Sequence, residues 1–361
     1  MPGHNGYVTI LLALLTLAQT ITIDSPRDYQ VFQRQTRDSG LILLKGTTTS
    51  QTLEVRLPHR RWTRIPVHPA THRFDAALPA PAGGFYALEY RAGKKHATIL
   101  HVGIGEVFVI AGQSNSTNYG EVKQQTRSRM VVSFNGETWA IADDPQPGVQ
   151  DNSHNVSFIP AFGDALYARY RVPIAVACVG HGSTSVRQWL PKGDRMEVEP
   201  TMTRFVTPVG PHEWESTGQL FNGMLRRIDE FGPHGFRALL WHQGESDAHQ
   251  KPEHDISGDT YRIMLERIIR ASRERAGWDF PWFVAEVSYH TPDDPSCPEI
   301  RDAQQAVWRD GLAFPGPDTD TLTGLNRQNQ GKGVHFSDQG LRAHGQIWAD
   351  KVGAWLDIIL K

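Results

Sequence analysis

Cysteine is nearly absent from this chain of 361 residues, which contains only Cys178 and Cys297. Two cysteines cannot form a disulfide framework, and no Cys-x-x-Cys pair is present to suggest structural zinc. Cys178 lies in the apolar run VPIAVACV, which favours a buried thiol that packs like a small hydrophobic residue over a reactive one. We therefore expect hydrophobic cores, not cross-links, to stabilise the fold.

The chain also lacks an excess of either charge. Its 37 Lys and Arg residues nearly balance its 39 Asp and Glu residues, and the net charge is −2. No long run of one sign occurs, which argues against electrostatic binding to nucleic acid or to anionic lipid. With 39% hydrophobic and 21% charged residues, the composition is typical of a soluble globular protein, and the length suggests two domains.

The apolar stretch at residues 7–18 (YVTILLALLTLA) is too short to span a bilayer but suits the core of a signal peptide. We interpret residues 1–20 as a signal peptide, which predicts a secreted or periplasmic protein without a membrane anchor after cleavage. The leading segment MPGHNG has no Lys or Arg, so a buried N-terminal strand is the alternative.

Residues 21–103 consist of short β-rich runs, such as LILLKGT and FYALEYRA, separated by turn-like segments such as PAPAGG. In the run LEVRL at residues 53–57, apolar and charged residues alternate, as in a sheet with one solvated face. This region predicts a small all-β sandwich domain of Ig-like size.

After residue 103 the pattern changes to apolar runs of strand length that alternate with amphipathic helical segments. The helical segments end at Gly232 and Gly277, and the last one begins near Ser337. The apolar runs are residues 106–111, 174–179, 237–242 and 282–287. Uniformly apolar strands joined by helices predict an α/β domain over residues 104–361, with three layers and a doubly wound parallel sheet.

Polar segments follow the predicted strands. They read GQSN at residues 112–115, GHGST at 180–184 and HQGESD at 242–247, and GVHFS at 333–337 precedes the last helix. Ligands of open parallel sheets bind beyond the carboxyl ends of the strands, so these segments should meet at one edge. Together they offer a hydroxyl, glycine amides, a side-chain amide and an imidazole, which are the groups that acyl transfer requires.

In their order, and in their places beside the expected strands and helix, these four motifs resemble those of the SGNH hydrolases, and most of all the branch of sialate O-acetylesterases and acetylxylan esterases. The resemblance covers roughly residues 104–352. It implies that Ser114 is the nucleophile and His335 the general base, and that Ser114, Gly182 and Gln243 form the oxyanion hole. It also implies catalysis without a metal or other cofactor.

One position departs from the family pattern, which usually has an acid three residues before the histidine. Lys332 stands there in this chain, and a lysine cannot accept a hydrogen bond from the imidazole. Glu245 is our first candidate for the missing acid and Glu286 the second. If neither acid orients His335, either a backbone carbonyl does so in a Ser-His dyad or the enzyme has lost its activity.

Several other residues allow two interpretations. Trp189 and Trp241 could stack on a sugar ring or fill a core. Four nearby residues could suggest a metal site, although solvated loop positions suit their spacing better: His242, Asp247, His249 and His254. Asn115 and Asn118 could position either a loop or the substrate.

The sequence therefore predicts a secreted carbohydrate O-acetylesterase whose partner is an acetylated carbohydrate substrate. An esterase for another acyl group, such as feruloyl, is the alternative within enzymes. The alternative from another class is a catalytically silent carbohydrate-binding protein. The loops expected to contact the sugar are residues 119–156 and 191–213. They contain no sequence motif that indicates a particular sugar.

Overall fold

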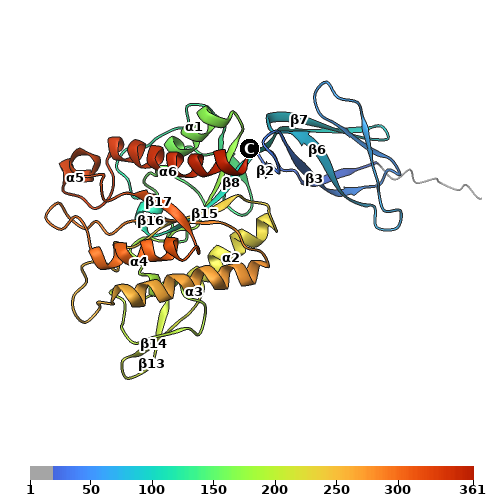
Figure 1. Ribbon diagram of the computed structural model, residues 1–361. Helices are drawn as coiled ribbons and strands as arrows, with labels where there is room; N and C mark the ends of the chain where they lie inside the picture. Colours follow the sequence, from blue (N-terminus) through green and yellow to red (C-terminus); the bar gives the residue numbers. More distant parts are fainter. Residues whose placement is uncertain (1–18) are drawn as a thin grey trace, which may run out of the picture.

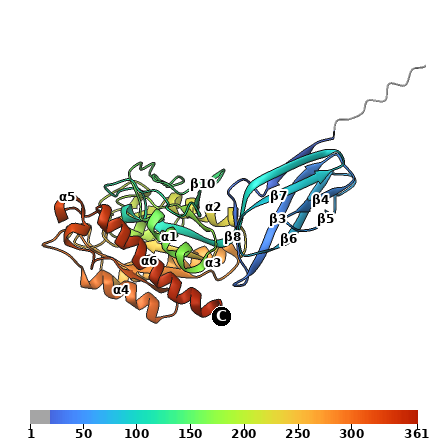
Figure 2. The ribbon, with the colours of Figure 1, turned by 90° about the horizontal axis from the view of Figure 1, so that it is seen from above.

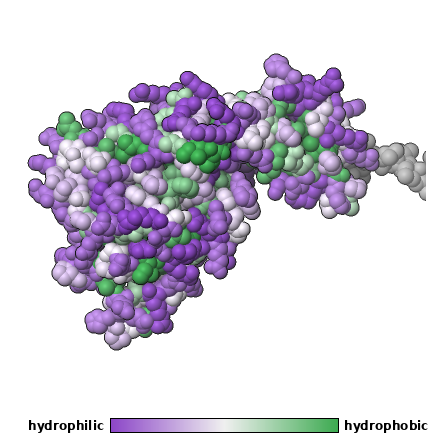
Figure 3. All heavy atoms as spheres, in the orientation of Figure 1, coloured by the Kyte–Doolittle hydropathy of each residue, from purple (hydrophilic) through white to green (hydrophobic). Residues whose placement is uncertain are grey.

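The computed structural model describes residues 19–361, and these form a β-rich part and a larger α/β part (Figure 1). Most of the predicted signal peptide, residues 1–18, lies outside the described residues. Within the described range, no helix is both long enough and apolar enough to cross a membrane. Hydrophilic residues cover most of the visible face of both parts (Figure 3).

The β-rich part has two layers around its own core. One layer is a three-stranded antiparallel sheet in the order β1-β3-β6, and the other contains β4, β5, β7 and the first half of β8. Both layers contribute to one hydrophobic cluster that includes Ile42, Val55 and Leu88. The strands are β1 Ile21–Ser25, β2 Val31–Gln33, β3 Ser39–Thr48, β4 Leu53–Arg56, β5 Thr63–Ile65, β6 Arg73–Pro81 and β7 Gly83–Ala92.

Strand β8, Lys95–Gly112, runs without interruption from the β-rich part into the α/β part. Its first half pairs with β7 in antiparallel fashion, and its second half pairs with β11 and β15 in parallel fashion. The two parts therefore share one mixed sheet of 11 strands, whereas a purely parallel sheet was expected. The division of the chain into domains at residue 103 stays a prediction.

The α/β part is built on the strand order β10-β9-β11-β8-β15-β16-β17. All these strands run parallel except β10, which is antiparallel to β9. Their bounds are β9 Val131–Phe134, β10 Trp139–Ile141, β11 Ile174–Cys178, β15 Ala238–His242, β16 Trp282–Glu286 and β17 Phe314–Asp318. A separate small sheet contains β12 Arg195–Met196, β13 Val206–Gly210 and β14 Glu213–Ser216.

Helices cover both faces of this sheet (Figures 1 and 2). Helices α1 and α6 pack on one face through Phe162, Trp348 and their neighbours, and α2, α3 and α4 pack on the other. The helices are α1 Ile159–Tyr170, α2 Gln219–Phe231, α3 Gly258–Ala276, α4 Pro298–Arg309, α5 Gln328–Gly331 and α6 Asp338–Ile359. The predicted mixed α/β architecture is confirmed, as are the helix ends at Gly232 and Gly277.

Gly112 ends β8 in a conformation that only glycine adopts readily, with a φ of 126°. An added Cβ would lie 2.1 Å from the carbonyl oxygen of His242. We expect Gly112→Ala to lower the free energy of unfolding by at least about 2 kcal/mol, because both the φ angle and the contact are unfavourable. Chemical denaturation measures this loss.

Gly277→Ala is the matched control, because Gly277 also has a positive φ, 73°, but an added Cβ would meet no atom within 4 Å. It should cost only about 1 kcal/mol. Equal losses in the two variants would show that the close packing at Gly112 is unimportant.

Candidate active site

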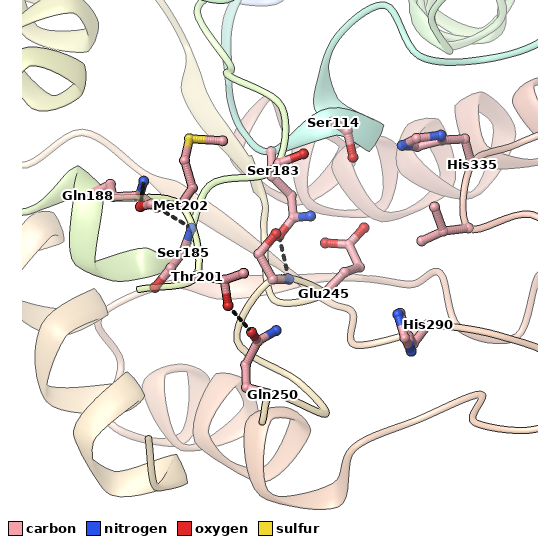
Figure 4. A pocket seen from close by; sticks show the side chains of 13 residues that line it. Ser114, Ser183, Ser185, Gln188, Thr201, Met202, Glu245, Gln250, His290 and His335 are labelled. Atoms are coloured by element: carbon pink, nitrogen blue, oxygen red, sulfur yellow. Dashed lines mark hydrogen bonds between the residues drawn. The ribbon is translucent and has the colours of Figure 1, made fainter. Parts of the chain in front are cut away.

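A cavity of about 330 Å³ is lined by residues that follow β8 and β15 and by the loop before α6 (Figure 4). Ser114, Glu245 and His335 all line it, although they lie far apart in the sequence. The remaining lining residues are Gln113, Ser183, Ser185, Gln188, Thr201, Met202, Ser246, Gln250, His290 and Val334. The structure thus brings the predicted nucleophile, base and first candidate acid to one site.

Ser114 begins a short 3-10 helix, Ser114–Ser116, directly after β8. The preceding residue, Gln113, fixes this turn, because its Oε1 accepts hydrogen bonds from the backbone N–H groups of Gly244 and Ser246 at 3.3 and 3.0 Å. Within residues 19–361, the backbone N–H of Ser114 donates no hydrogen bond to another backbone or side-chain group. It is therefore free to bind a substrate oxygen.

His335 lies on a loop held in place by the buried side chain of Arg327. This guanidinium donates hydrogen bonds to the carbonyl oxygens of Val334 and Thr319 at 2.7 and 2.9 Å, and it lies over the ring of Phe336. Burial, and secondarily the positive charge of Arg327, lower the pKa of His335 to about 4. The imidazole is therefore neutral at neutral pH, as a general base must be.

The imidazole of His335 extends toward the side chain of Ser114 (Figure 4). The ring of Tyr119 packs against it, with 5.1 Å between ring centroids. In the described part of the chain, no hydrogen bond joins the His335 ring to Ser114. Catalytic hydrogen bonds are often long before substrate binds, so the absence of this hydrogen bond is compatible with proton transfer from Ser114 to His335 during the reaction.

Glu245 presents a carboxyl group to the same cavity. Its Oε1 accepts a hydrogen bond of 2.9 Å from Asn115 Nδ2 and lies 3.7 Å from His242 Nδ1, whereas its buried Oε2 has no partner among residues 19–361. Burial raises the pKa of Glu245 to about 7. Asn115 thus positions a carboxyl group, while Asn118 bonds the backbone of Gln146 and holds a loop.

Among residues 19–361, no Asp or Glu side chain forms an ion pair with His335 within 4.0 Å. Glu286, the second candidate, pairs with Arg301 at 2.6 Å and accepts a hydrogen bond from Gln305 at 2.8 Å. Its carboxylate is therefore already engaged on α4. Glu245 is the candidate acid that lines the cavity together with His335.

Two predicted oxyanion donors are engaged elsewhere. The backbone N–H of Gly182 donates to Asp151 Oδ2 at 2.6 Å, so it can bind a substrate oxygen only if Asp151 releases it. Gln243 is fully buried, and its Nε2 donates to Asp247 Oδ2 at 2.6 Å and to the Thr184 carbonyl at 3.1 Å. The oxyanion roles of Gly182 and Gln243 stay predictions.

The interpretation of Trp189 and Trp241 as sugar platforms is wrong. Both side chains are fully buried, and their rings pack edge to face with centroids 5.1 Å apart. Both belong to the core between the sheet and helices α2 to α4. The thiol of Cys178 is also buried, as expected, and burial raises its pKa.

The histidines and the aspartate that could have suggested a metal site lie in separate environments. His242 bonds Thr319, Asp247 bonds Ser185, and His249 pairs with Asp294. His254 bonds the carbonyl oxygen of Glu199. Over residues 19–361, no group of three or more His, Cys, Asp or Glu side chains could hold a metal ion.

Three buried histidines should make the folded state sensitive to acid. Burial lowers the pKa of His242 to about 3 and that of His335 to about 4, and it also lowers the pKa of His344. The unfolded chain takes up these protons near pH 6.5, so the free energy of unfolding should fall between about pH 6.5 and 4. Each histidine contributes up to about 1.4 kcal/mol per pH unit, and the raised pKa of Glu245 opposes one of them.

Chemical denaturation at pH 7 and pH 4.5 measures this loss, and His335→Asn should reduce it. His72→Asn is the control, because His72 is exposed and lies outside the cavity. An equal acid sensitivity of wild type and His335→Asn would contradict the lowered pKa of His335.

A serine at the carboxyl end of a strand, beside a neutral imidazole and a carboxyl group, forms the set of groups that ester hydrolases place on α/β folds. The family described as carbohydrate esterase, sialic acid-specific acetylesterase matches residues 104–354 of this chain. The match covers more than half of the sequence, so the chain belongs to this family and is a carboxylic ester hydrolase. The predicted resemblance is thus confirmed.

One solved structure supports the fold. A carbohydrate acetylesterase from Xanthomonas citri matches with a TM-score of 0.56 and 16% identity, over 91% of this chain and 74% of that chain. A protein from Arabidopsis thaliana matches with a TM-score of 0.47 and 17% identity, over 70% of this chain and 98% of that chain. No curated protein matches the sequence significantly.

Proposed function

We propose that this protein is a carbohydrate O-acetylesterase with a Ser-His mechanism. Ser114 Oγ attacks the acetyl carbonyl carbon while His335 accepts the hydroxyl proton, and His335 then returns that proton to the departing sugar oxygen. Water, activated by His335, next attacks the acetyl-Ser114 ester and releases acetate. The cavity shared by Ser114 and His335 is the observation that carries this proposal.

Glu245 has the role of the missing acid in this proposal. Its carboxylate would accept a hydrogen bond from the His335 ring through one water molecule and so fix the tautomer that presents a free nitrogen to Ser114. The unpartnered Oε2 of Glu245 supports this role, because a buried carboxylate oxygen requires a hydrogen-bond donor.

The oxyanion hole begins, in this proposal, with the free backbone N–H of Ser114. Gly182 would contribute its N–H after Asp151 releases it. Gln243 would have to turn its amide away from Asp247, so we rank it last of the three donors. Each such donor contributes about 3 to 4 kcal/mol of transition-state stabilisation.

The cavity lining favours a small acyl group on a polar alcohol over a feruloyl group. Hydroxyl and amide groups of Ser183, Ser185, Gln188, Thr201 and Gln250 surround the cavity and match the hydroxyl groups of a sugar. Met202 and Val334 are the only apolar residues among those that line the cavity, and Phe, Tyr and Trp are absent from its lining, whereas ligand pockets are usually lined mostly by apolar and aromatic side chains. We further propose that the protein acts outside the cytoplasm, as the apolar N-terminal segment suggests.

Acetate release from acetylated xylan, mannan, pectin and O-acetylated sialic acid tests the proposed substrate class, with a feruloyl ester as the competing substrate. We expect acetate from at least one carbohydrate and little ferulate, and no release by Ser114→Ala. Faster hydrolysis of the feruloyl ester would assign the second function, and no release from any ester would favour the silent binding protein.

A further inference from the structure

The net charge of −2 hides an uneven distribution along the chain. Residues 19–103 contain twelve Lys and Arg but only six Asp and Glu, a net charge of +6. Residues 1–18 carry no charged side chain, so residues 104–361 have a net charge of −8. The positive charge is therefore concentrated on the β-rich part, away from the esterase site.

Part of this charge surrounds a hollow on the β-rich part. The hollow has a volume of about 880 Å³ and lies between the segment after β4 and the end of β6. Arg56, Arg60 and Arg61 line it, and Asp38 is its only acidic lining residue. Arg56 pairs with Glu89 at 2.7 Å, whereas Arg60 and Arg61 are exposed and form no ion pair within residues 19–361.

A second, smaller hollow of about 180 Å³ adjoins the first at Asp38. It lies where the β-rich part meets the end of α1 and is lined by four arginines: Arg34, Arg37, Arg169 and Arg171. Asp38 is again the only acidic lining residue. The two hollows, which share Asp38 in their linings, thus bring seven arginines together.

Arg34 contributes a buried guanidinium group to the lining of the smaller hollow. Its side chain is only 2% exposed, and Nε pairs with Glu106 at 2.6 Å. Its Nη2 has no hydrogen-bond partner in the described part of the chain. Of the other lining arginines, Arg169 pairs with Asp357, whereas Arg37 and Arg171 are exposed and form no ion pair in residues 19–361.

We propose that these two hollows, which we call the arginine belt, bind an anionic polysaccharide that carries carboxylate groups, such as a uronate polymer. Guanidinium groups bind carboxylates through two parallel hydrogen bonds, and repeated carboxylates can occupy both hollows at once. The belt would then select acidic acetylated polysaccharides as substrates. This role in substrate selection rests on the proposed esterase function.

The dimensions fit a polymer that contacts both sites. Strand β8 leads from the junction to Ser114, and the eleven residues from Val102 to Gly112 span about 33 Å. One polysaccharide chain can therefore lie on the belt while a distant acetyl group enters the cavity. The belt would act by raising the local concentration of substrate.

Nucleic acid fits the belt less well. Duplex DNA carries one charge per about 1.7 Å, and the −8 charge of residues 104–361 would repel so dense a polyanion. Among the residues that line the two hollows, Tyr170 in the smaller hollow is the only Phe, Tyr or Trp on which a base could stack. A sparsely charged uronate polymer avoids much of this repulsion.

Binding to polygalacturonate tests the proposal, with Ser114→Ala as the common background so that no ester is hydrolysed during the measurement. Arg60→Glu/Arg61→Glu should weaken binding at least about tenfold at low salt, because each change replaces attraction with repulsion. The control is Arg127→Glu/Arg226→Glu, which makes the same charge change at exposed arginines outside both hollows. It should bind as the background protein does.

Three outcomes would overturn the proposal: equal binding by the belt and control variants, binding to neutral mannan as tight as to polygalacturonate, or tighter binding to duplex DNA at the same salt. Hydrolysis of a small acetyl ester, measured with the belt changes in active protein, separates the two proposals. Unchanged hydrolysis with weakened polymer binding supports the belt, and absence of esterase activity in wild type refutes only the proposed function.

Discussion

Ser114→Ala is expected to lower kcat for acetyl-ester hydrolysis by at least about 1000-fold without lowering the melting temperature. The acetyl-enzyme cannot form without the hydroxyl. Within residues 19–361, Ser114 Oγ forms no hydrogen bond whose loss would destabilise the fold. Steady-state kinetics and thermal unfolding measure the two effects.

Ser246→Ala is the matched control, because Ser246 lines the same cavity and bonds Gln113 through its backbone only. It should keep more than about half of the wild-type rate, as substitutions outside the reacting groups usually have small effects. Loss of activity in Ser246→Ala with retention in Ser114→Ala would reverse the assignment of the nucleophile.

His335→Ala should lower kcat to a similar level, and the double variant should be no slower than either single variant. Residues that act as one unit give losses that are not additive. Additive losses in kcat would show that Ser114 and His335 act independently.

Glu245→Gln is expected to change both the size and the pH dependence of kcat/KM. If ionised Glu245 orients His335, activity in wild type should rise with pH through about 7, the raised pKa of Glu245. In the variant the rise should move to about pH 4, the pKa of His335, and the plateau should be lower by about 10-fold to 100-fold. Measuring kcat/KM for a soluble acetyl ester from pH 3.5 to 9, at about half-unit steps, distinguishes a rise near pH 7 from a rise near pH 4.

Glu286→Gln is the control for this experiment, because Glu286 pairs with Arg301 and is absent from the cavity lining. Its pH profile should match that of wild type. If Glu245→Gln retains the wild-type profile, Glu245 is not the orienting acid. A shifted profile in Glu286→Gln would transfer that role to Glu286.

The sequence predicted the gathering of Ser114, Glu245 and His335 because strand ends can be recognised locally. Each apolar run is followed by a polar segment, and parallel strands bring such segments to one edge. The missed contributors lie outside the helices and strands whose periodicity can be recognised in the sequence. Arg327 holds the His335 loop, and Tyr119 and Asp151 come from a loop without periodicity, so no local pattern indicates their contacts.

The continuity of β8 could not be predicted for a related reason. Gly103 and Gly105 resemble a turn between domains, but they lie inside a strand where another chain segment approaches closely. An added Cβ on Gly105 would lie 1.9 Å from the carbonyl oxygen of Pro173. These glycines serve packing, and the packing partner is almost 70 residues away, beyond the reach of a local pattern.

The most direct test of the nucleophile is covalent labelling with a fluorophosphonate, which reacts with activated serine hydroxyl groups. Four serines line the cavity: Ser114, Ser183, Ser185 and Ser246. Peptide mapping by mass spectrometry after a short reaction identifies the residue that carries the phosphonate. We predict labelling of Ser114, strongly slowed in His335→Ala, whereas labelling of another cavity serine, or of Ser114 at the same rate without His335, would contradict the proposed mechanism.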